Sequence, residues 1–327
     1  MFFYFRKIKI HGIKNVSKNK PVLLLSNHQN ALLDALLIAT KCGRFSYFLT
    51  RAAVFKKPLV SKILISLQML PVYRVRDGWS SISNNNAIFE TCSTLLNTNE
   101  AVVIFPEGSH NLKRAVRPLS KGFTRIVFDT LEKYPETDLQ LIPVGLNFEH
   151  AEKFPDSTSL FFGKPLCAKD FISENRNDDV VKLKAKIQSK IAELTTHIPS
   201  DKYKEIETTL NNLQVDYLNP KAVNNCIANH FENCETNRKP KIKNIRMFFK
   251  SLLILNLLLP YLIWKFIAEP KIDEIEFTST FRFAIAITLV PFYLLILGIL
   301  LAYSFSFKIA IIYIISVLII SLLAVKL

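Results

Sequence analysis

A histidine and an aspartate six positions apart, His28 and Asp34, have types and spacing that can do chemistry. An apolar run ends just before them at Ser26, and a strongly apolar stretch, 31–40, contains Asp34 in its first turn. A helix advances about 100° per residue, so these side chains would lie about 120° apart around one helix. They can meet if His28 lies in the turn before the helix and Asp34 reaches back. That arrangement gives an imidazole oriented by a carboxylate, the base and orienting group of a catalytic triad.

A purely structural interpretation of these residues stays open. Asn27 or Asn30 would cap the helix, Asp34 would favour its positive end, and His28 would be incidental. A carboxylate among leucines is costly to bury without a partner, and this favours pairing of Asp34 with His28. No nucleophilic serine or cysteine is required if the substrate supplies the hydroxyl group.

A second polar group, residues 106–111, follows the apolar run 101–105. Pro106 stops the strand, and Gly108 lets the backbone come close to a ligand. Exposed amides in this turn would bind a phosphate or an oxyanion. Such a turn is ordinary on its own, so its meaning depends on its place beside the first group.

Short apolar runs alternate with helix-length patterns through residues 1 to about 245, and this favours an α/β fold with the sheet largely covered by helices. Ligands of such sheets gather beyond the carboxyl ends of the strands, where both polar groups fall. From 168 to about 240 the sequence becomes polar with helical periodicity, which indicates a helical extension or linker. The predicted strands are 21–26, 45–50, 70–75, 101–105, 139–148 and 160–162, and the predicted helices are 31–40, 57–67, 81–96 and 120–134.

The net charge and the glycine spacing limit the classes of partner and ligand that this chain can bind. There are 42 lysines and arginines against 27 acids, a net charge of +15, which points to nucleic acid, an anionic membrane surface or phosphorylated substrates. The 8 glycines include no glycine-x-glycine spacing, which excludes the dinucleotide fingerprint and the Walker loop. Nucleic acid is not expected, because the main basic cluster adjoins an apolar segment and no recognition module is present.

The apolar residues concentrate at the C-terminal end. Residues 283–307 and 309–325 form uncharged runs of 25 and 17 residues, and a membrane span takes about 20 residues with a lower limit near 17. A shorter run of 14, 251–264, is flanked by Lys250 and Lys265, which can snorkel. We predict two or three spans, at about 247–267, 283–304 and 308–326, the first being an interfacial helix in the alternative interpretation.

The flanks of these runs predict an orientation. Basic residues precede the first run, and the loop 268–280 carries four acids against one lysine, which places the preceding domain in the cytoplasm. The first ten residues do not form a signal peptide, and the five cysteines have no paired close spacing, as expected of reduced thiols. Cys226, His230 and Cys234 lack a fourth ligand nearby, so no metal site is expected. The basic residues are Arg238, Lys239, Lys241, Lys243, Arg246 and Lys250.

Taken together, Asn27-His28, Asp34 and the later Phe-Pro-Glu-Gly at 105–108 resemble the glycerolipid acyltransferase family over roughly residues 15–170. The resemblance implies that His28 is the general base and that Asp34 orients it. It implies a mixed sheet covered by helices in an acyltransferase domain, 1–168, before a helical extension, 169–245, and a membrane region, 246–327. Further similarities to the family's motifs are Ile142-Pro143-Val144 and Gly163-Lys164-Pro165.

The resemblance also implies a substrate-binding set, in which arginines hold a phosphate and Glu107 and Gly108 help to bind the acceptor. That set is Asn27, Arg51, Arg74, Arg76, Glu107, Gly108, Ser109 and Lys121.

Two departures from the family pattern concern the acceptor. Five residues separate His28 from Asp34 where the family usually has four, and this longer form is similar to the branch acting on glycerol 3-phosphate or dihydroxyacetone phosphate. Ser109-His110 replaces the family's Thr-Arg, and the lost cation could come from Lys113, Arg114 or Arg117.

The expected function is therefore a membrane-bound acyltransferase that acylates the free hydroxyl of 1-acyl-glycerol 3-phosphate and yields phosphatidate. Acyl-coenzyme A or acyl carrier protein would be the donor substrate, and no resident cofactor or metal is expected. The first alternative is acylation of glycerol 3-phosphate or dihydroxyacetone phosphate. The second is a membrane-anchored lipid-binding protein without turnover.

Overall fold

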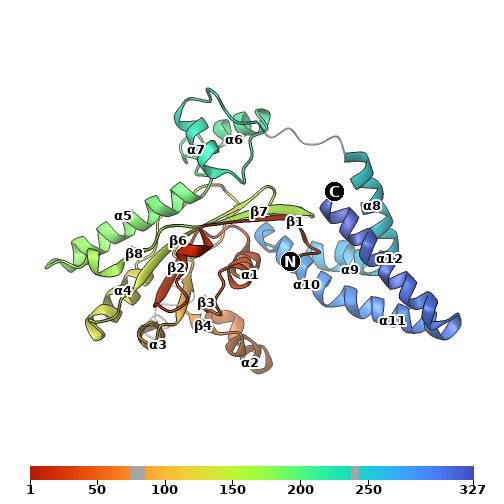
Figure 1. Cartoon of the computed structure of the whole chain (residues 1–327), viewed down its shortest axis with the longest axis horizontal. Helices are drawn as coiled ribbons and strands as arrows, with labels where there is room; N and C mark the ends of the chain where they lie inside the picture. Colours follow the sequence, from red (N-terminus) through yellow and green to blue (C-terminus); the bar gives the residue numbers. More distant parts are fainter. Residues whose placement is uncertain (74–84, 237–242) are drawn as a thin grey trace.

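The computed structural model describes residues 1–73, 85–236 and 243–327 of the 327-residue chain. Within these ranges the N-terminal part is built on one mixed sheet in the order β1-β7-β6-β2-β5-β3-β4, with β8 paired to β6 (Figure 1). The strands are β1 (Phe5–His11), β2 (Val22–Ser26), β3 (Tyr47–Arg51), β4 (Met69–Val72), β5 (Ala101–Ile104), β6 (Gln140–Phe148), β7 (Asp156–Phe162) and β8 (Leu166–Cys167).

Strand β2 lies at the centre of the sheet. This position explains why its sequence is apolar up to the last residue, Ser26. It pairs in parallel with β5 and with β6, so that Leu24 lies level with Val103 and Ile142. Leu23 belongs to the core on one face of the sheet and Leu24 to the core on the other, because successive side chains point to opposite faces. Since β3 and β4 run parallel to β5 as well, the carboxyl ends of all these strands meet at one edge.

Helices cover both faces, which confirms the predicted α/β class. Phe123 and Phe128 of α4 pack with residues of α3 and α5 on one face, and Leu33 and Leu37 of α1 pack on the other. The polar sequence after residue 168 contains an amphipathic helix, α5, whose Leu183 is fully buried in the first core. The helices are α1 (Ala31–Lys41), α2 (Pro58–Ser66), α3 (Asn85–Asn97), α4 (Gly122–Lys133) and α5 (Arg176–Leu194).

The predicted elements agree with the observed ones to within a few residues wherever they can be compared. The end of the predicted strand 70–75 and the start of the predicted helix 81–96 lie outside the described residues, as do Arg238, Lys239 and Lys241. Strand β1, which pairs in parallel with β7, was not predicted, because its lysines and arginine break the apolar pattern typical of a strand.

A small satellite unit follows α5. Helices α6 (Tyr203–Asn212) and α7 (Pro220–Ala228) enclose a separate apolar cluster that includes Leu210 and Val223. Cys226 at the end of α7 forms a disulfide bond with Cys234. The expectation that all five cysteines are reduced thiols is therefore wrong for this pair.

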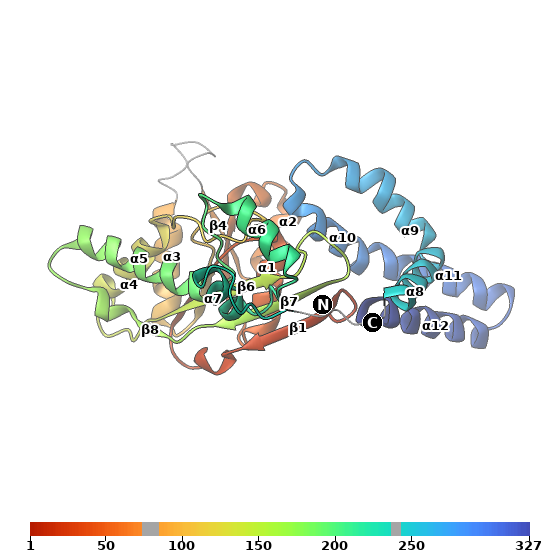
Figure 2. The ribbon, with the colours of Figure 1, turned by 90° about the horizontal axis from the view of Figure 1, so that it is seen from above.

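The C-terminal helices extend to one side of the sheet domain in both views (Figures 1 and 2). Among the residues that the structure describes, two segments are long and apolar enough to cross a membrane: Ile275–Ser304 with 30 residues and Phe307–Lys326 with 20. A third pair, Asn244–Asn256 with Leu258–Lys271, is bent by 94°. The helices are α8 (Lys243–Asn256), α9 (Leu258–Ile263), α10 (Thr278–Ile287), α11 (Leu289–Ser304) and α12 (Phe307–Lys326).

The bent pair leaves the sheet domain and returns to it. Before the bend, the Lys250 amine donates to the carbonyl of Phe154 at 3.4 Å. After it, the Ser279 hydroxyl donates to the carbonyl of Ala151 at 2.6 Å. The acidic loop 268–280 therefore lies against the sheet domain, and the bent pair before it has the form of either a broken span or a segment that turns back. The geometry fits the interfacial interpretation of the first apolar run.

Asp156, the first residue of β7, is a buried carboxyl group whose ionisation opposes folding. The residue is 3% exposed. One of its carboxyl oxygens accepts a hydrogen bond from the backbone N–H of His150 at 2.8 Å. Burial raises the pKa of Asp156 to about 7. The folded state therefore holds a proton that the unfolded chain releases near pH 4.

We predict that Asp156→Asn flattens the pH dependence of stability. A raised carboxyl pKa stabilises the fold fully below the unfolded pKa, and this contribution is lost as pH rises through about 7, at up to about 1.4 kcal/mol per pH unit. Unfolding free energies at pH 5.5 and 8 should therefore differ less in the variant than in the parent. The exposed change Asp170→Asn is the control, and an unchanged slope in Asp156→Asn would contradict the assignment.

Candidate active site

The structure brings His28 and Asp34 together. His28 lies in the turn between β2 and α1, and Asp34 reaches back from the first turn of α1. The His28 Nδ1 atom lies 2.7 Å from Asp34 Oδ2. The geometric expectation from the spacing of these two residues is thus met.

The Asp34 carboxylate is fully buried and holds the whole turn in place. Its Oδ2 atom also accepts the backbone N–H groups of Gln29 and Asn30, each at 2.7 Å. Three donors on one oxygen compensate for the removal of the charge from water. Asn30 makes no side-chain cap to α1, and its amide instead donates to the carbonyl of Ala151. The interpretation in which an asparagine side chain caps this helix is therefore wrong, because the Asn27 and Asn30 side chains bind the backbone of Leu146 and Ala151 instead.

The His28 ring is held by two contacts. Its Nδ1 atom bonds Asp34, and its face stacks on the ring of Phe105 with centroids 4.1 Å apart. The side chain is 12% exposed. A proton on Nδ1, shared with the carboxylate, leaves the lone pair of Nε2 as a proton acceptor.

The two polar groups predicted from the sequence form one site. The backbone N–H of His28 donates to the Glu107 carboxylate, and the N–H of Asn111 donates to the carbonyl of His28 at 3.1 Å. The Gln29 amide adds a bond to the carbonyl of Leu112 at 3.1 Å. The turn after β5 is thereby attached to the turn after β2.

Arg117 supplies the cation in this turn. Its Nε atom lies 2.6 Å from Glu107 Oε2, and one terminal nitrogen donates to the Ser109 hydroxyl at 2.6 Å. A second terminal nitrogen donates to the Ser109 carbonyl. Of the other proposed cations, Arg114 donates hydrogen bonds to the carbonyls of Phe148 and Glu149. The amine of Lys113 lies over the Tyr203 ring.

Glu107 is a buried acid whose pKa lies near neutral pH. Its side chain is 3% exposed, and burial raises its pKa to about 7 although Arg117 acts in the opposite direction. Gly108 beside it has φ +73°, a left-handed conformation that favours glycine, with open space where a Cβ would lie. Its N–H donates to the carbonyl of Phe105, so this amide serves the turn.

The remaining predicted residues occupy varied positions. The Asn27 side chain exchanges two hydrogen bonds with the backbone of Leu146, at 3.0 and 2.8 Å, and so joins the end of β2 to β6. Arg51 is exposed at the carboxyl end of β3, two strands from β2, and Lys121 is exposed just before α4. Arg74 and Arg76 lie outside the described residues.

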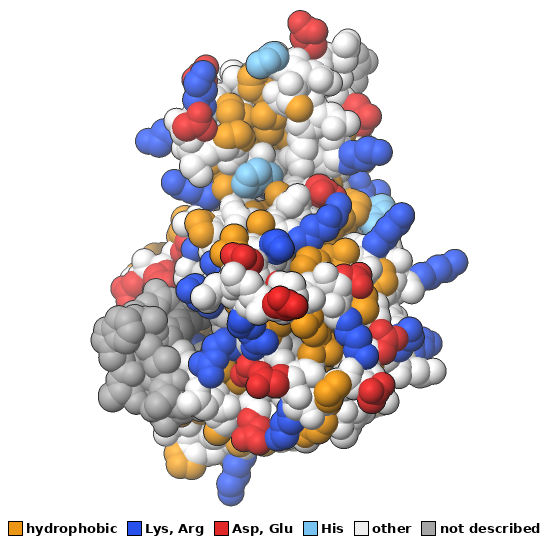
Figure 3. Space-filling model, turned by 90° about the vertical axis from the view of Figure 1, so that its left-hand side faces the viewer, with side chains coloured by type: hydrophobic (Ala, Val, Ile, Leu, Met, Phe, Trp, Pro, Cys, Tyr) orange, Lys and Arg blue, Asp and Glu red, His pale blue; other side chains and the backbone are white. Residues whose placement is uncertain are grey.

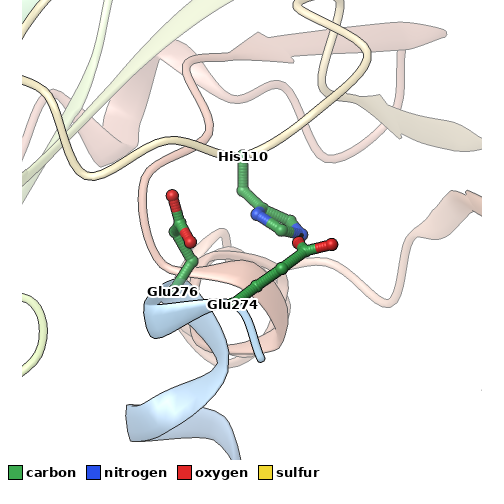
Figure 4. Close-up of side chains that lie close together, drawn as sticks. All are labelled: His110, Glu274 and Glu276. Carbon is green, nitrogen blue, oxygen red and sulfur yellow. Dashed lines mark ion pairs between the residues drawn. The ribbon is translucent and has the colours of Figure 1, made fainter. Parts of the chain in front are cut away.

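The C-terminal region adds residues that the sequence analysis did not place here. The His110 ring lies edge-on to His28, with centroids 5.6 Å apart, and also contacts the ring of Phe277. His110 Nε2 lies 3.5 Å from a carboxylate oxygen of Glu274. Figure 4 shows the Glu274 side chain reaching the His110 ring from the C-terminal region. Glu276 lies close by, and among the described residues His110, Glu274 and Glu276 form the group with spacing suited to a metal ion, their ligand atoms within 4.8 Å of one another.

Fold and site together define an α/β protein with a histidine–aspartate pair at the carboxyl edge of parallel strands. Residues 7–147 match the family model for Acyltransferase. Relatives include glycerol-3-phosphate O-acyltransferase 1 of Saccharomyces cerevisiae, 27% identical over 25% of this chain and 11% of that protein. A chloroplastic 1-acyl-sn-glycerol-3-phosphate acyltransferase of Brassica napus is 26% identical over 43% of this chain and 38% of its own length.

Residues 7–147 of this chain are therefore similar to acyltransferases, and the named relatives are acyltransferases of glycerolipid synthesis. The aligned region spans well under half the length of either curated relative. Among solved structures, the 1-acyl-sn-glycerophosphate acyltransferase of Thermotoga maritima aligns with a TM-score of 0.39 and 19% identity, over 56% of this chain and 71% of that one.

We predict that Asp34→Asn lowers stability without unfolding the domain. The amide oxygen can accept the three bonds now made by Oδ2, but the amide nitrogen would replace Oδ1, which is buried without a hydrogen-bond partner. An unsatisfied buried donor costs about 1–3 kcal/mol. Denaturant unfolding should show a loss of that size, and the exposed change Asp170→Asn should show none. An Asp34→Asn variant as stable as the parent would contradict the buried geometry.

Proposed function

We propose that this chain transfers an acyl group from an acyl thioester to a hydroxyl group of a glycerol-phosphate lipid. The observation that carries this proposal is the His28–Asp34 pair, with Nδ1 fixed on a buried carboxylate and Nε2 left as the accepting atom. No serine or cysteine side chain is hydrogen-bonded to His28 within residues 1–73, 85–236 and 243–327. This favours direct attack by a substrate hydroxyl over an acyl-enzyme route.

The chemistry follows from this geometry. The acceptor hydroxyl attacks the thioester carbonyl carbon while Nε2 of His28 takes its proton. The carbon–sulfur bond then breaks, the thiolate leaves, and the imidazolium returns the proton to the sulfur. Asp34 holds the ring in the required tautomer and stabilises the imidazolium. General-base catalysis of this kind contributes about 10²–10⁴-fold to the rate.

Cations at the same edge of the sheet would position the acceptor. Arg51 ends β3 on this edge, and Arg117 lies against the turn that follows β5, where it binds Glu107 and Ser109. Arginine binds phosphate through charge-assisted, two-pronged hydrogen bonds. Holding the phosphate away from the reacting centre places the hydroxyl, so its binding energy raises the rate. Arg74 and Arg76 stay in the proposal as further phosphate ligands on the family resemblance.

The preferred acceptor is 1-acyl-glycerol 3-phosphate, which would give phosphatidate, with acyl-coenzyme A or acyl carrier protein as donor. Glycerol 3-phosphate or dihydroxyacetone phosphate is the second candidate. The five-residue spacing between His28 and Asp34 favours that candidate, and the named relatives include acyltransferases for both kinds of acceptor.

We also propose that the protein is a multi-pass membrane protein. Segments Ile275–Ser304 and Phe307–Lys326 would form a hairpin of two spans, since the amine of Lys326 returns to the carbonyl of Phe5 at 2.8 Å. The basic residues before α8 favour a cytoplasmic position for the acyltransferase domain. The bent pair α8–α9 would lie in the interface beside it.

A paired-acceptor assay tests the choice of substrate. Purified protein in lipid nanodiscs should form phosphatidate from 1-acyl-glycerol 3-phosphate and an acyl thioester, with a higher kcat/KM than for glycerol 3-phosphate. Activity confined to glycerol 3-phosphate or dihydroxyacetone phosphate would move the assignment to the second candidate.

Replacing the base separates an enzyme from a lipid-binding protein. His28→Ala should lower kcat by about 10²–10⁴-fold, because the imidazole accepts the proton in the transition state. The exposed His230→Ala is the matched control and should keep the parent rate. If His28→Ala retained full turnover, or if the parent bound lipids without turnover, the catalytic assignment would fail.

A further inference from the structure

Helix α2 is an apolar helix with no buried residue. Leu59, Ile63 and Leu67 recur at intervals of four and are 72%, 51% and 48% exposed. Side chains at this spacing lie on one face of a helix. Ile65 is 61% exposed in addition. A soluble protein seldom leaves such a contiguous apolar surface facing water without a partner for it.

The charged residues near this face in the sequence all have one sign. From Ala35 to Arg76 the sequence contains no aspartate or glutamate but eight lysines and arginines. Lys56 and Lys57 precede α2 and Lys62 lies within it, all three exposed. A helix with an apolar face and lysines at its border suits a bilayer surface with anionic head groups, which attract the cations while the apolar side chains enter the interface.

The opposite end of the domain has a different surface. Figure 3 views the face turned away from α8–α12, and there lysines, arginines, aspartates and glutamates lie interspersed. Val181 of α5 is exposed by 66% but stands among polar residues of that helix. Unlike this face, the α2 segment combines an apolar stripe with cations alone.

The position of α2 connects this surface with the site. The chain leaves the carboxyl end of β3 at Arg51, passes through the short helix η2 (Ala52–Phe55), and enters α2 at Pro58. The first turn of α2 therefore lies towards the sheet edge that carries His28. The helices that extend from the domain (Figures 1 and 2) would hold it close to a bilayer, so that even a weak surface contact would form at high effective concentration.

We propose that the face of α2 formed by Leu59, Ile63 and Leu67 is a second membrane-binding surface, which docks the carboxyl edge of the sheet on anionic lipid. It is separate from the C-terminal helices and acts after they have anchored the chain. On the proposed function, docking would let a lipid acceptor present its hydroxyl and phosphate to His28 while its acyl chain stays in the bilayer.

Fluorescence depth measurement tests the docking directly. In a Cys167→Ser background, Ile63→Cys is labelled with an environment-sensitive fluorophore in the full chain, at one molecule per nanodisc containing anionic lipid. The other thiols, Cys42 and Cys92, are buried. The label should emit at shorter wavelength and be quenched by lipids carrying a nitroxide near the head group. The same label at Val181→Cys, the control position, should report water.

Two results would overturn the docking. One is a label at position 63 that is as accessible to a water-soluble quencher as the label at position 181. The other is protection that appears only with two or more molecules per disc, since the occupant would then be a second copy of the chain. Neither measurement depends on catalytic turnover, so the outcome stands whether or not the proposed reaction is found.

An activity comparison tests the consequence for function. The double change Leu59→Asp and Ile63→Asp should lower the rate on lipid acceptor embedded in nanodiscs by about tenfold, because two apolar contacts with the bilayer are lost. The rate on water-soluble short-chain substrates should be unchanged, which also reports that the variant is folded. Val181→Asp should change neither rate. Equal loss on both kinds of substrate, or no loss on either, would contradict the proposal.

Discussion

The carboxylate of Asp34 is the group on which the rest of the site depends. It is buried at the start of α1, and one oxygen receives the imidazole of His28 and the amides of Gln29 and Asn30. A buried carboxylate without donors would be strongly destabilising, so the chain between β2 and α1 must fold back to supply them. The same bonds that stabilise the charge set the direction of the histidine ring. Stabilising the buried charge and orienting the histidine ring are here one requirement.

A second requirement joins this turn to its neighbour. Parallel pairing of β2 with β5 places the turn after each strand at one edge, where the amide of His28 reaches the Glu107 carboxylate. Arg117 then offsets the buried negative charge and holds Ser109. The outcome is a compact set of charges, Asp34, Glu107 and Arg117, around an imidazole that is nearly shielded from water. Such preorganised charge is worth more in a dry site than in solvent.

The apolar C-terminal region is part of this arrangement and more than an anchor. Its loop brings Glu274 to His110, and Phe283 of α10 joins the core on the face of the sheet that α1 covers. The bent pair α8–α9 leaves and returns beside the same domain. The C-terminal helices therefore contact both the site and the sheet core that α1 covers.

The sequence alone predicted most of the strands and helices of the sheet domain and the pairing of His28 with Asp34. Strong apolar runs such as 101–105 predict buried strands because burial on both faces of a parallel sheet demands them. The spacing of His28 and Asp34 around a helix start limited their geometry to a turn that folds back. Strand β1 escaped prediction because edge position lets lysines alternate along it, and α5 was seen only as a polar extension, although every fourth residue from Leu183 to Ile191 enters the core.

Tertiary structure decided everything that depends on segments distant in the chain. Three cations were equal candidates in the sequence, yet Arg114 is held in the interior by carbonyls of β6 and the residue after it, while Arg117 faces Glu107. The contact of Glu274 with His110 joins residues more than 160 positions apart, and no local pattern encodes it. The reason is physical: periodicity reports which side of an element is apolar, whereas the partner of a charged side chain is chosen by the packing of whole elements against one another.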